Sequence, residues 1–550
     1  MINNPVLPGF HPDPSIIRVE SDFYMVTSSF EWFPGVPLYH SKDLCHWHQI
    51  GHLLKSRKQI DLTGVKPSRG VWAPGLSYCE SERRFYLVYS KVVNRNPWLF
   101  DVENYMIWTE DILGEWSEPL YINSSGFDPS IFHDEDGTKW ILNKDRDFRP
   151  ENIDKRSIVI QQFDMSDKKL VGKPVVISHG ATSRRFVEGA HLFKKDGWYY
   201  LFTAEGGTGY GHCVALARSA SILGPYEACP HNPILSSAAE DFIGTESAHF
   251  LQPERYNPLV RLQKAGHGCL VDTTGGEWYM AHLCARPVLP QLRCILGRET
   301  AIQKMAWTPD GWLAMASGCH LPEDKVPAPA LPAPPFPPEP IQYDFDDRKL
   351  QLCFCTPRNE ITPDWADVIS RKGFLRLRGR QSLSSNYDVS LLARRLTSFK
   401  AQVTTSMYFE PDHYHHMAGL TCYYDSESHY CVYKTYNQAT GDSELKVYAF
   451  LHKHMQIFEA SACVPTNATV ILRASIHDAE LTFEYSTDSV LYHQIGPKMD
   501  MSMLSDEASR CGCFTGAFVG MFAQDTHTME KWAEFDWFRY EENQLSTYGF

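Results

Sequence analysis

The sequence predicts an all-β protein in which a five-bladed β-propeller is followed by a β-sandwich domain. Three observations support this prediction. A short aromatic strand returns five times in the first three hundred residues, at intervals of roughly 60 residues. A proline-rich stretch then interrupts the chain, and the remainder alternates apolar with polar residues. We expect the propeller to cover residues 1–322, the linker residues 323–341 and the sandwich residues 342–550.

The repeated strand follows a turn and carries an aromatic core. Its copies lie at residues 22–26, 84–88, 137–142, 197–201 and 276–280. Short strands separated by turn residues, with no helical period, predict antiparallel sheets. A sheet unit that repeats at a regular interval is typical of a radial arrangement, with one blade for each copy.

A second motif precedes each copy and predicts where the functional site lies. It is a turn that leads into a small apolar strand, which in a propeller is the strand that lines the central channel. The residues that open these five strands therefore face a common axis; they are Asp13, Trp72, Asp128, Glu188 and His267. Unpaired buried carboxylates are costly, so three of them at one axis indicate chemistry or ligand binding rather than a core.

The linker and the second domain follow from composition and period. The prolines between residues 327 and 340 favour a stiff, extended connector. Beyond it, segments such as 374–377, 401–404 and 430–433 alternate in period two between turns. This pattern predicts a β-sandwich.

The composition excludes several partners. A net charge of −14 argues against nucleic acid, which requires a basic face. No apolar run is long enough to span a membrane, and the N-terminus does not resemble a secretion signal. The 15 cysteines are scattered, which favours free thiols in a reducing compartment, and we expect a cytoplasmic protein. The oligomeric state stays open, with a homo-oligomer among the alternatives.

The axial motifs resemble those of glycoside hydrolase family 43. The residues that carry the resemblance are 11–15 (His-Pro-Asp-Pro-Ser), 71–74 (Val-Trp-Ala-Pro), 126–130 (Gly-Phe-Asp-Pro-Ser) and 187–189 (Val-Glu-Gly). Residues 205–212 and 296–303 resemble, more narrowly, the two-domain β-xylosidases of that family. The likeness covers essentially the whole chain, and its motifs are specific in combination.

The resemblance implies a role for each axial residue. Asp13 matches the general base, Glu188 the general acid, and Asp128 the third carboxylate, which orients the acid and raises its pKa. Substrate contacts are implied for Arg298, Trp72, Phe30, Thr208, His267 and, from a sandwich loop that caps the pocket, Phe514 (with Phe518 as the fallback). No cofactor is required, although some relatives hold a divalent cation such as Ca²⁺ beside the histidine that matches His267.

The implied activity is the release of xylose from the non-reducing ends of short β-1,4-xylooligosaccharides, by an exo-acting, inverting enzyme. Inversion places a water between the base and the anomeric carbon, so the two working carboxyls stand ~6.5–9.5 Å apart. An α-L-arabinofuranosidase or a dual enzyme would use the same fold and mechanism. A non-catalytic sugar-binding propeller is the remote alternative, although it predicts the loss of a carboxylate.

Simpler interpretations of single residues stay open at this point. Asp-Pro-Ser is also ordinary turn sequence, and Trp72 and Phe30 could be core aromatics. Arg298 could pair with Glu299, and His267 could be a neutral channel histidine. Two stretches near the pocket rim depart from the subgroup: residues 286–298 look short and residues 238–257 look long. The subsites for the leaving group are therefore not predicted.

Overall fold

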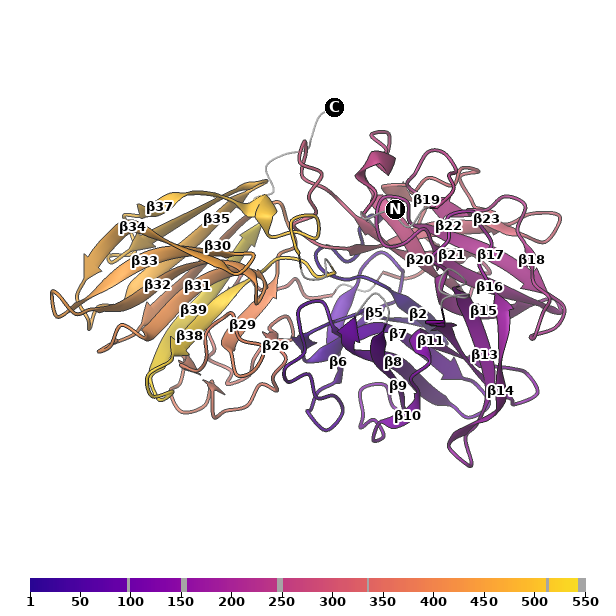
Figure 1. Ribbon diagram of the computed structural model, residues 1–550, viewed down its shortest axis with the longest axis horizontal. Coiled ribbons are helices and arrows are strands. Elements are labelled where there is room, and N and C mark those ends of the chain that lie inside the picture. The colour runs from indigo at the N-terminus through magenta and orange to yellow at the C-terminus, as the bar shows by residue number, and fades with distance from the viewer. Residues whose placement is uncertain (96–98, 150–155, 245–250, 334–335, 511–513, 543–550) are drawn as a thin grey trace.

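The computed structural model describes residues 1–95, 99–149, 156–244, 251–333, 336–510 and 514–542. These residues are almost entirely strands and loops, and their two helical segments are single 3-10 turns at Pro253–Arg255 and Met501–Met503. No helix in the described ranges is long and apolar enough to cross a membrane. Figure 1 shows two β-rich bodies side by side, with the N-terminal half of the chain in one and the C-terminal part in the other. The predicted all-β class is confirmed.

Five antiparallel sheets follow one another along the first body. In order from the inner strand outward they are β2 (Ser15–Val19), β3 (Asp22–Val26), β5 (Gly35–Ser41) and β6 (His48–Leu54); β7 (Gly70–Cys79), β8 (Arg84–Arg95), β9 (Phe100–Thr109) and β10 (Leu120–Asn123); β11 (Gly126–His133), β12 (Lys139–Asp145), β13 (Ser157–Asp164) and β14 (Lys169–Ser178); β15 (Glu188–Lys195), β16 (Trp198–Glu205), β17 (Cys213–Ser219) and β18 (Glu227–Ala228), with β19 (Leu235–Ser236) also on β17; and β20 (Gln263–Asp272), β21 (Trp278–Ala285), β22 (Glu299–Trp307) and β23 (Leu313–Met315). The inner strands β2, β7, β11, β15 and β20 contact one another in a closed ring, so the sheets are the blades of a propeller.

The aromatic repeat explains how the blades adhere. Successive residues of a strand point to opposite faces, so one strand serves the interfaces on both sides of its blade. Leu38 of the first blade packs with Leu87 of the second in one buried cluster. Met25, on the other face of the first blade, packs with Tyr279 of the fifth. Similar clusters join the remaining neighbours, and burying these residues holds the ring together.

The ring closes along a boundary between the first and fifth blades, which we call the seam. Each of these blades is one continuous stretch of chain, and among the described strands no blade sheet combines the two ends of the propeller. The short strand β1 (Ile2–Asn3) instead pairs with β24 (Lys325–Val326) outside the blades. Across the seam, Arg18 forms a bidentate ion pair with Asp272, with an N–O distance of 2.9 Å. The seam is therefore sealed by side chains and by one small ribbon.

The inner strands share a backbone kink near the axis. One residue in each has a left-handed φ: Asp13 (55°), Ala73 (35°), Asp128 (54°), Gly189 (58°) and His267 (50°). In β7, β11, β15 and β20 the pairing register also slips beside this residue, as in a β-bulge. A bulge re-aims the neighbouring side chains. A left-handed non-glycine residue costs about 1–3 kcal/mol and persists where the surrounding structure holds it.

The second body is a sandwich of two antiparallel sheets. An eight-stranded sheet contains β27 (Ala366–Asp367), β28 (Leu375–Arg378), β39 (Trp532–Glu542), β30 (Lys400–Tyr408), β35 (Val470–His477), β36 (Glu480–Ser486) and β37 (His493–Asp500), with β25 (Gln342–Tyr343) on β39. A six-stranded sheet contains β29 (Ser390–Arg395), β38 (Phe518–Asp525), β31 (His416–Asp425), β32 (Ser428–Asn437), β33 (Asp442–Leu451) and β34 (His454–Val464). The main apolar core lies between the two sheets. The predicted sandwich is confirmed.

The six-stranded sheet is the one that meets the propeller. Its outer face contributes Tyr433, Phe518 and Phe522 to a buried cluster with Trp32 and Trp72 of the propeller. In addition, β26 (Thr356–Pro357) pairs with β4 (Trp32–Phe33). The six-stranded sheet therefore lies between the propeller and the eight-stranded sheet, whose outer face points away from the propeller.

Candidate active site

The structure brings the three predicted carboxylates together at the axis. Asp13 directly precedes β2, Asp128 lies in β11, and Glu188 begins β15, so three different blades supply them. Asp13 and Asp128 are each 7% exposed. Burial raises the pKa of Asp128 well above its ordinary value, and the negative charges of Glu188 and Asp13 raise it further. Three acids that share one enclosed space cannot all be ionised at low cost.

Asp13 is held as an acceptor on both oxygens. Ser28 donates to Oδ2 at 2.7 Å, and Arg298 donates from Nη1 to Oδ1 at 3.1 Å. His267 Nδ1 lies 3.6 Å from the same Oδ1. The Ser28 hydroxyl itself accepts from the Ala73 amide at 2.7 Å, so the neighbouring bulge fixes its position. This arrangement orients an ionised carboxylate toward the axis.

Arg298 links the base to the sandwich domain. Its second amino group, Nη2, donates to the Phe514 carbonyl oxygen at 3.1 Å, and the side chain is only 2% exposed. The alternative pairing with Glu299 does not occur, because Glu299 accepts two hydrogen bonds from Arg286, both at 2.7 Å. Arg298 is thus committed to the axial site.

Three aromatic rings from separate segments form one wall beside these groups. The ring centroids of Phe30 and Trp72 lie 5.6 Å apart, and Phe514 lies 6.0 Å from Phe30 and 5.3 Å from Trp72. The guanidinium of Arg298 sits 5.4 Å from the Phe514 ring. Phe518 instead stacks on Trp32 at 3.5 Å within the interdomain core. Of the two candidates for a capping aromatic, the structure thus places Phe514 at the site.

His267 is packed against the bulge that follows Glu188. A Cβ added at Gly189 would lie 2.9 Å from the ring of His267, so only glycine fits there, and the φ of +58° favours it too. Burial lowers the pKa of His267, which favours the neutral ring. The described residues contain no group of three or more His, Cys, Asp or Glu side chains placed to hold a metal. A cation beside His267 would therefore lack a cage of protein side chains.

Lys144 is a site residue that the sequence motifs do not reveal. It lies in β12, and its Nζ donates to Glu188 Oε2 at 2.8 Å. Its side chain is 2% exposed, and Nζ also lies 4.6 Å from the Phe127 ring centroid. The only sequence signal is a lysine in the repeat strand directly after the apolar residues 140–142. A buried cation that contacts the predicted acid changes the electrostatics of the site.

The pKa directions are the reverse of what the resemblance implies. Burial alone would raise the pKa of Glu188, but the charge and hydrogen bond of Lys144 lower it below its ordinary value, with smaller effects from His212 and Arg156. Burial lowers the pKa of Lys144 to about 8. Asp128, by contrast, has the raised pKa. Without substrate, the proton shared by the two acids therefore belongs to Asp128, and Glu188 is paired as a carboxylate.

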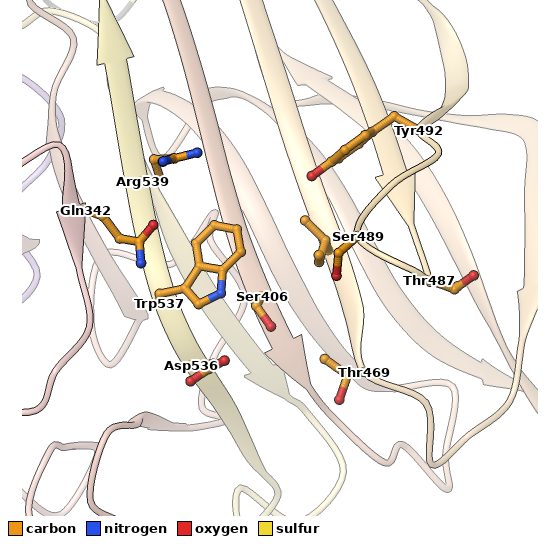
Figure 2. Close-up of a pocket in the computed structure, with 10 residues that line it drawn as sticks. Gln342, Ser406, Thr469, Thr487, Ser489, Tyr492, Asp536, Trp537 and Arg539 are labelled. Atoms are coloured by element: carbon orange, nitrogen blue, oxygen red, sulfur yellow. The ribbon is translucent and has the colours of Figure 1, made fainter.

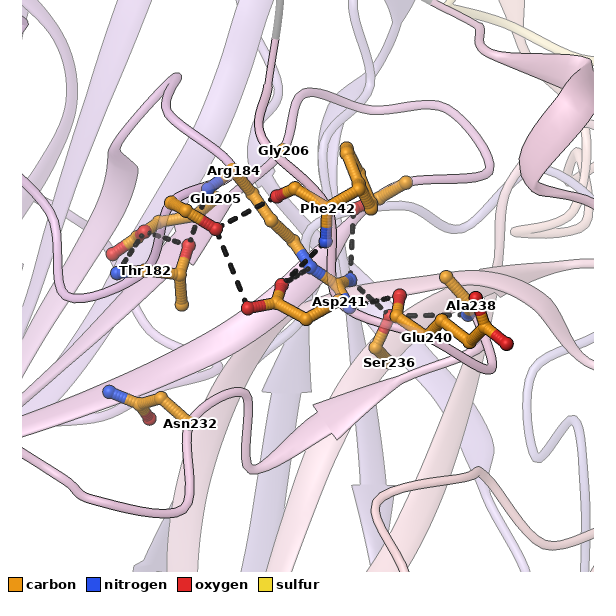
Figure 3. A network of polar contacts seen from close by, with 12 residues as sticks. Thr182, Arg184, Glu205, Gly206, Asn232, Ser236, Ala238, Glu240, Asp241 and Phe242 are labelled. Atoms are coloured by element: carbon orange, nitrogen blue, oxygen red, sulfur yellow. Dashed lines mark hydrogen bonds and ion pairs between the residues drawn. The ribbon is translucent and has the colours of Figure 1, made fainter.

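The pocket rim is built from the turn after β16 and the long stretch at residues 238–257, of which 245–250 lie outside the described residues. The buried Arg184 fastens this stretch: its Nε lies 3.2 Å from Asp241, its Nη1 donates to Ser236 at 2.6 Å, and it covers the Phe242 ring (Figure 3). Thr208 lies half-buried in the neighbouring turn. Within the described part of the chain, no hydrogen bond joins Thr208 to the other predicted site residues.

Known proteins share this architecture over the full chain. The family model for glycosyl hydrolases family 43 matches residues 2–313, and the model for the β-xylosidase C-terminal concanavalin A-like domain matches residues 342–541. Xylosidase/arabinosidase 43B from Humicola insolens is 40% identical over 99% of this chain and 98% of that protein. Xylan 1,3-beta-xylosidase from a Vibrio species is 39% identical over 98% and 99%.

Solved structures agree with the sequence relatives. The crystal structure of xylan beta-1,4-xylosidase from Bacillus halodurans C-125 superposes with a TM-score of 0.92 and 43% identity, covering 98% of this chain and 100% of the other. Both the propeller and the sandwich are included in that match. The chain therefore belongs to glycosyl hydrolases family 43, in its two-domain form with a C-terminal β-xylosidase-type sandwich.

Proposed function

We propose that this chain is an exo-acting, inverting β-xylosidase that releases xylose from the non-reducing ends of short β-1,4-xylooligosaccharides. The observation that carries the proposal is the convergence of Asp13, Asp128 and Glu188 in a pocket walled by aromatic rings. The names of the relatives support xylose as the sugar. In this proposal the propeller, residues 1–322, carries the chemistry, and the sandwich, residues 342–550, closes the pocket.

Asp13 is the proposed general base. It would deprotonate the water that attacks the anomeric carbon, and inversion follows because the water arrives on the face opposite the leaving group. Arg298 and Ser28 hold the carboxylate in place through the contacts at 3.1 and 2.7 Å. These two donors stabilise the charge while leaving the base oriented, and Arg298 is also within the pocket to contact a sugar hydroxyl.

Glu188 is the proposed general acid, with Lys144 as its proton partner. A substrate that displaces water from the pocket makes the separated charges of the Lys144–Glu188 pair less favourable. Transfer of the proton from Lys144 to Glu188 then gives a neutral amine and a neutral acid. Because burial already lowers the pKa of Lys144 to about 8, this transfer is a small step near neutral pH. The protonated Glu188 can then donate to the leaving oxygen.

Lys144→Met provides a direct test of this electrostatic coupling. Activity falls with rising pH where the acid loses its proton, and Lys144 lowers the pKa of that acid. Removing the cation raises the pKa of Glu188, so the alkaline limb of kcat/KM on xylobiose is expected to move upward by about one to three pH units. A pH–rate profile from pH 4 to 10 measures the shift. Lys139→Met, which removes a lysine paired with Glu82 farther out on the same strand, is the control. An unmoved or lowered limb would refute the coupling.

The enclosed pocket supports attack on chain ends rather than within a polymer. Phe514 comes from the sandwich, yet its ring contacts Phe30 and Trp72 of the propeller and is 6% exposed. A pocket closed on this side has room for a terminal sugar but no path for a chain to continue. Aromatic rings also match the apolar face of a pyranose.

Proton NMR of xylobiose hydrolysis tests the proposed function. We expect α-xylose to appear first from the β-1,4-linked dimer, because an inverting enzyme changes the anomeric configuration once. β-Xylose appearing first would exclude the inverting mechanism, and no release would favour a binding protein. Parallel rates on β-1,3-xylobiose and on paired aryl β-xyloside and α-L-arabinofuranoside substrates decide the linkage and test a dual activity, which the name of the Humicola relative makes the second candidate.

We also propose a cytoplasmic location. Every cysteine that the structure describes is a free thiol, and most of them are buried. Free thiols are usual in reducing compartments. The natural substrates would then be short oligosaccharides that have entered the cell.

A further inference from the structure

A second hollow lies in the sandwich, on the face that points away from the propeller. It has a volume of about 580 Å³ and is bordered by β25, β30, β35, β39 and the β36–β37 loop (Figure 2). The opposite face of this eight-stranded sheet supplies Val403, Leu472 and Phe538 to the sandwich core. The hollow is therefore separated from the catalytic pocket by the full thickness of the sandwich.

Strand register places a continuous row of side chains across the floor of this hollow. Ser406 of β30 is paired with Trp537 of β39 on one side and with Ile471 of β35 on the other. Ile471 is paired in turn with Ser486 of β36. Directly paired residues point to the same face of a sheet. Because neighbouring strands lie about 4.8 Å apart, the row spans about 15 Å, which suits a short chain of rings better than a single ring.

The chemistry of the lining matches a sugar. The half-buried Trp537 offers a flat apolar ring, and Figure 2 shows it among polar groups that include Ser406 and Gln342. A pyranose has the same duality, with a flat C–H face and a rim of hydroxyls. Asp536 and Arg539 also line the hollow and carry opposite charges, so the lining favours a neutral ligand. A single carboxylate among the lining residues supplies no acid–base pair, which indicates binding rather than hydrolysis.

One wall of the hollow is already fixed in shape. In the β36–β37 loop, Asp488 Oδ1 accepts hydrogen bonds from the amides of Val490 and Leu491, both at 2.9 Å. The Tyr492 ring, which also lines the hollow, is covered by the Arg473 guanidinium at 3.3 Å. A wall that is held without ligand loses little conformational entropy when a ligand binds.

We propose that this hollow is a second carbohydrate site, which binds a short stretch of a neutral β-linked xylose chain without cleaving it. The pyranose character of the ligand follows from the lining, whereas the choice of xylose rests on the proposed function. Because the hollow and the catalytic pocket are on different sides of the sandwich, one molecule can hold a polysaccharide and process a chain end at the same time. Such tethering raises the local concentration of chain ends.

Calorimetric titration with xylohexaose tests the proposal. In a full-length Asp13→Asn background, which prevents hydrolysis, we expect two binding sites, and we expect Trp537→Ala to remove one of them. Trp532→Ala is the matched control, because Trp532 begins the same strand and lies under Arg376 outside the hollow. In the catalytically active chain, Trp537→Ala should leave kcat on xylobiose unchanged within about twofold, since Trp537 lies outside the proposed catalytic machinery.

The outcomes separate this proposal from the proposed function. If Trp537→Ala binds as many xylohexaose molecules as the Trp532→Ala control, the second site is refuted even when xylobiose is hydrolysed. If the wild-type chain fails to hydrolyse xylobiose but loses one site on Trp537→Ala substitution, the proposed function fails and the second site stands. Equal Trp537-dependent binding of a glucose hexamer would overturn the assignment to xylose.

Discussion

Asp13→Asn is expected to lower kcat on xylobiose by about 10²–10⁴-fold, the usual contribution of a general base. Asparagine keeps the shape of the side chain and can still accept from Ser28 and Arg298, but its amide cannot take a proton from water. KM should change little, because the walls of the pocket are untouched. Steady-state kinetics on xylobiose, with circular dichroism to show that the fold survives, measures the effect.

The matched control for this substitution is Asp22→Asn. Asp22 lies on β3 of the same blade, where it pairs with His40 and Lys42 away from the axis. It should retain kcat within about twofold, so a loss confined to Asp13→Asn reports on the axis and not on the blade. A kcat of Asp13→Asn within tenfold of the wild-type value would exclude Asp13 as the base.

Glu188→Gln is expected to cause a loss that depends on the leaving group. A general acid matters most when the departing oxygen is strongly basic, so xylobiose should lose about 10²–10⁴-fold in kcat/KM. An aryl β-xyloside whose phenol is acidic needs no proton and should be hydrolysed almost as fast as by the wild type. Glutamine can still accept from Lys144, which limits the structural disturbance.

A plot of log kcat/KM against the pKa of the leaving phenol shows this difference as a steeper slope for the variant. The alkaline limb of its pH profile should also vanish, since the group that titrates there is gone. Glu277→Gln, which removes a carboxylate paired with Lys304 on the fifth blade, serves as control. Equal losses on all leaving groups would contradict the acid role of Glu188.

The fold was predictable because its information is local and repeated. The aromatic strand at residues 22–26 and its four later copies each form the second strand of a blade, and the strand before each copy is the inner one. Period-two alternation in segments such as 430–433 likewise appears as strands of the sandwich. Patterns of this kind need only the sequence period and the turn residues between the strands.

The axial carboxylates were predictable for the same reason, since Asp13, Asp128 and Glu188 occupy equivalent places in the repeat. Lys144 was not, because it pairs with Glu188 across two neighbouring blades. A repeat gives the position of a residue along its strand but not which buried side chain of the next blade it will meet. The pKa directions depend on that contact, and they could be found only from the structure.

The rim was beyond prediction because it has no repeat at all. The stretch around Asp241 and Phe242 is held by Arg184, a buried residue more than fifty positions earlier. Such long-range polar contacts follow no period, so the sequence marked the stretch as unusually long without indicating where it would lie.

The seam between the first and fifth blades also runs through the catalytic pair. Asp13 belongs to the start of the ring and Arg298 to its end, so their 3.1 Å contact bridges the two blades that only side chains and the β1–β24 ribbon hold together. Any breathing of the ring along this boundary would separate the base from its arginine while every blade stayed folded. Catalysis is thus coupled to ring closure: the two ends of the propeller must meet before the base is armed, and a partly opened ring is silent.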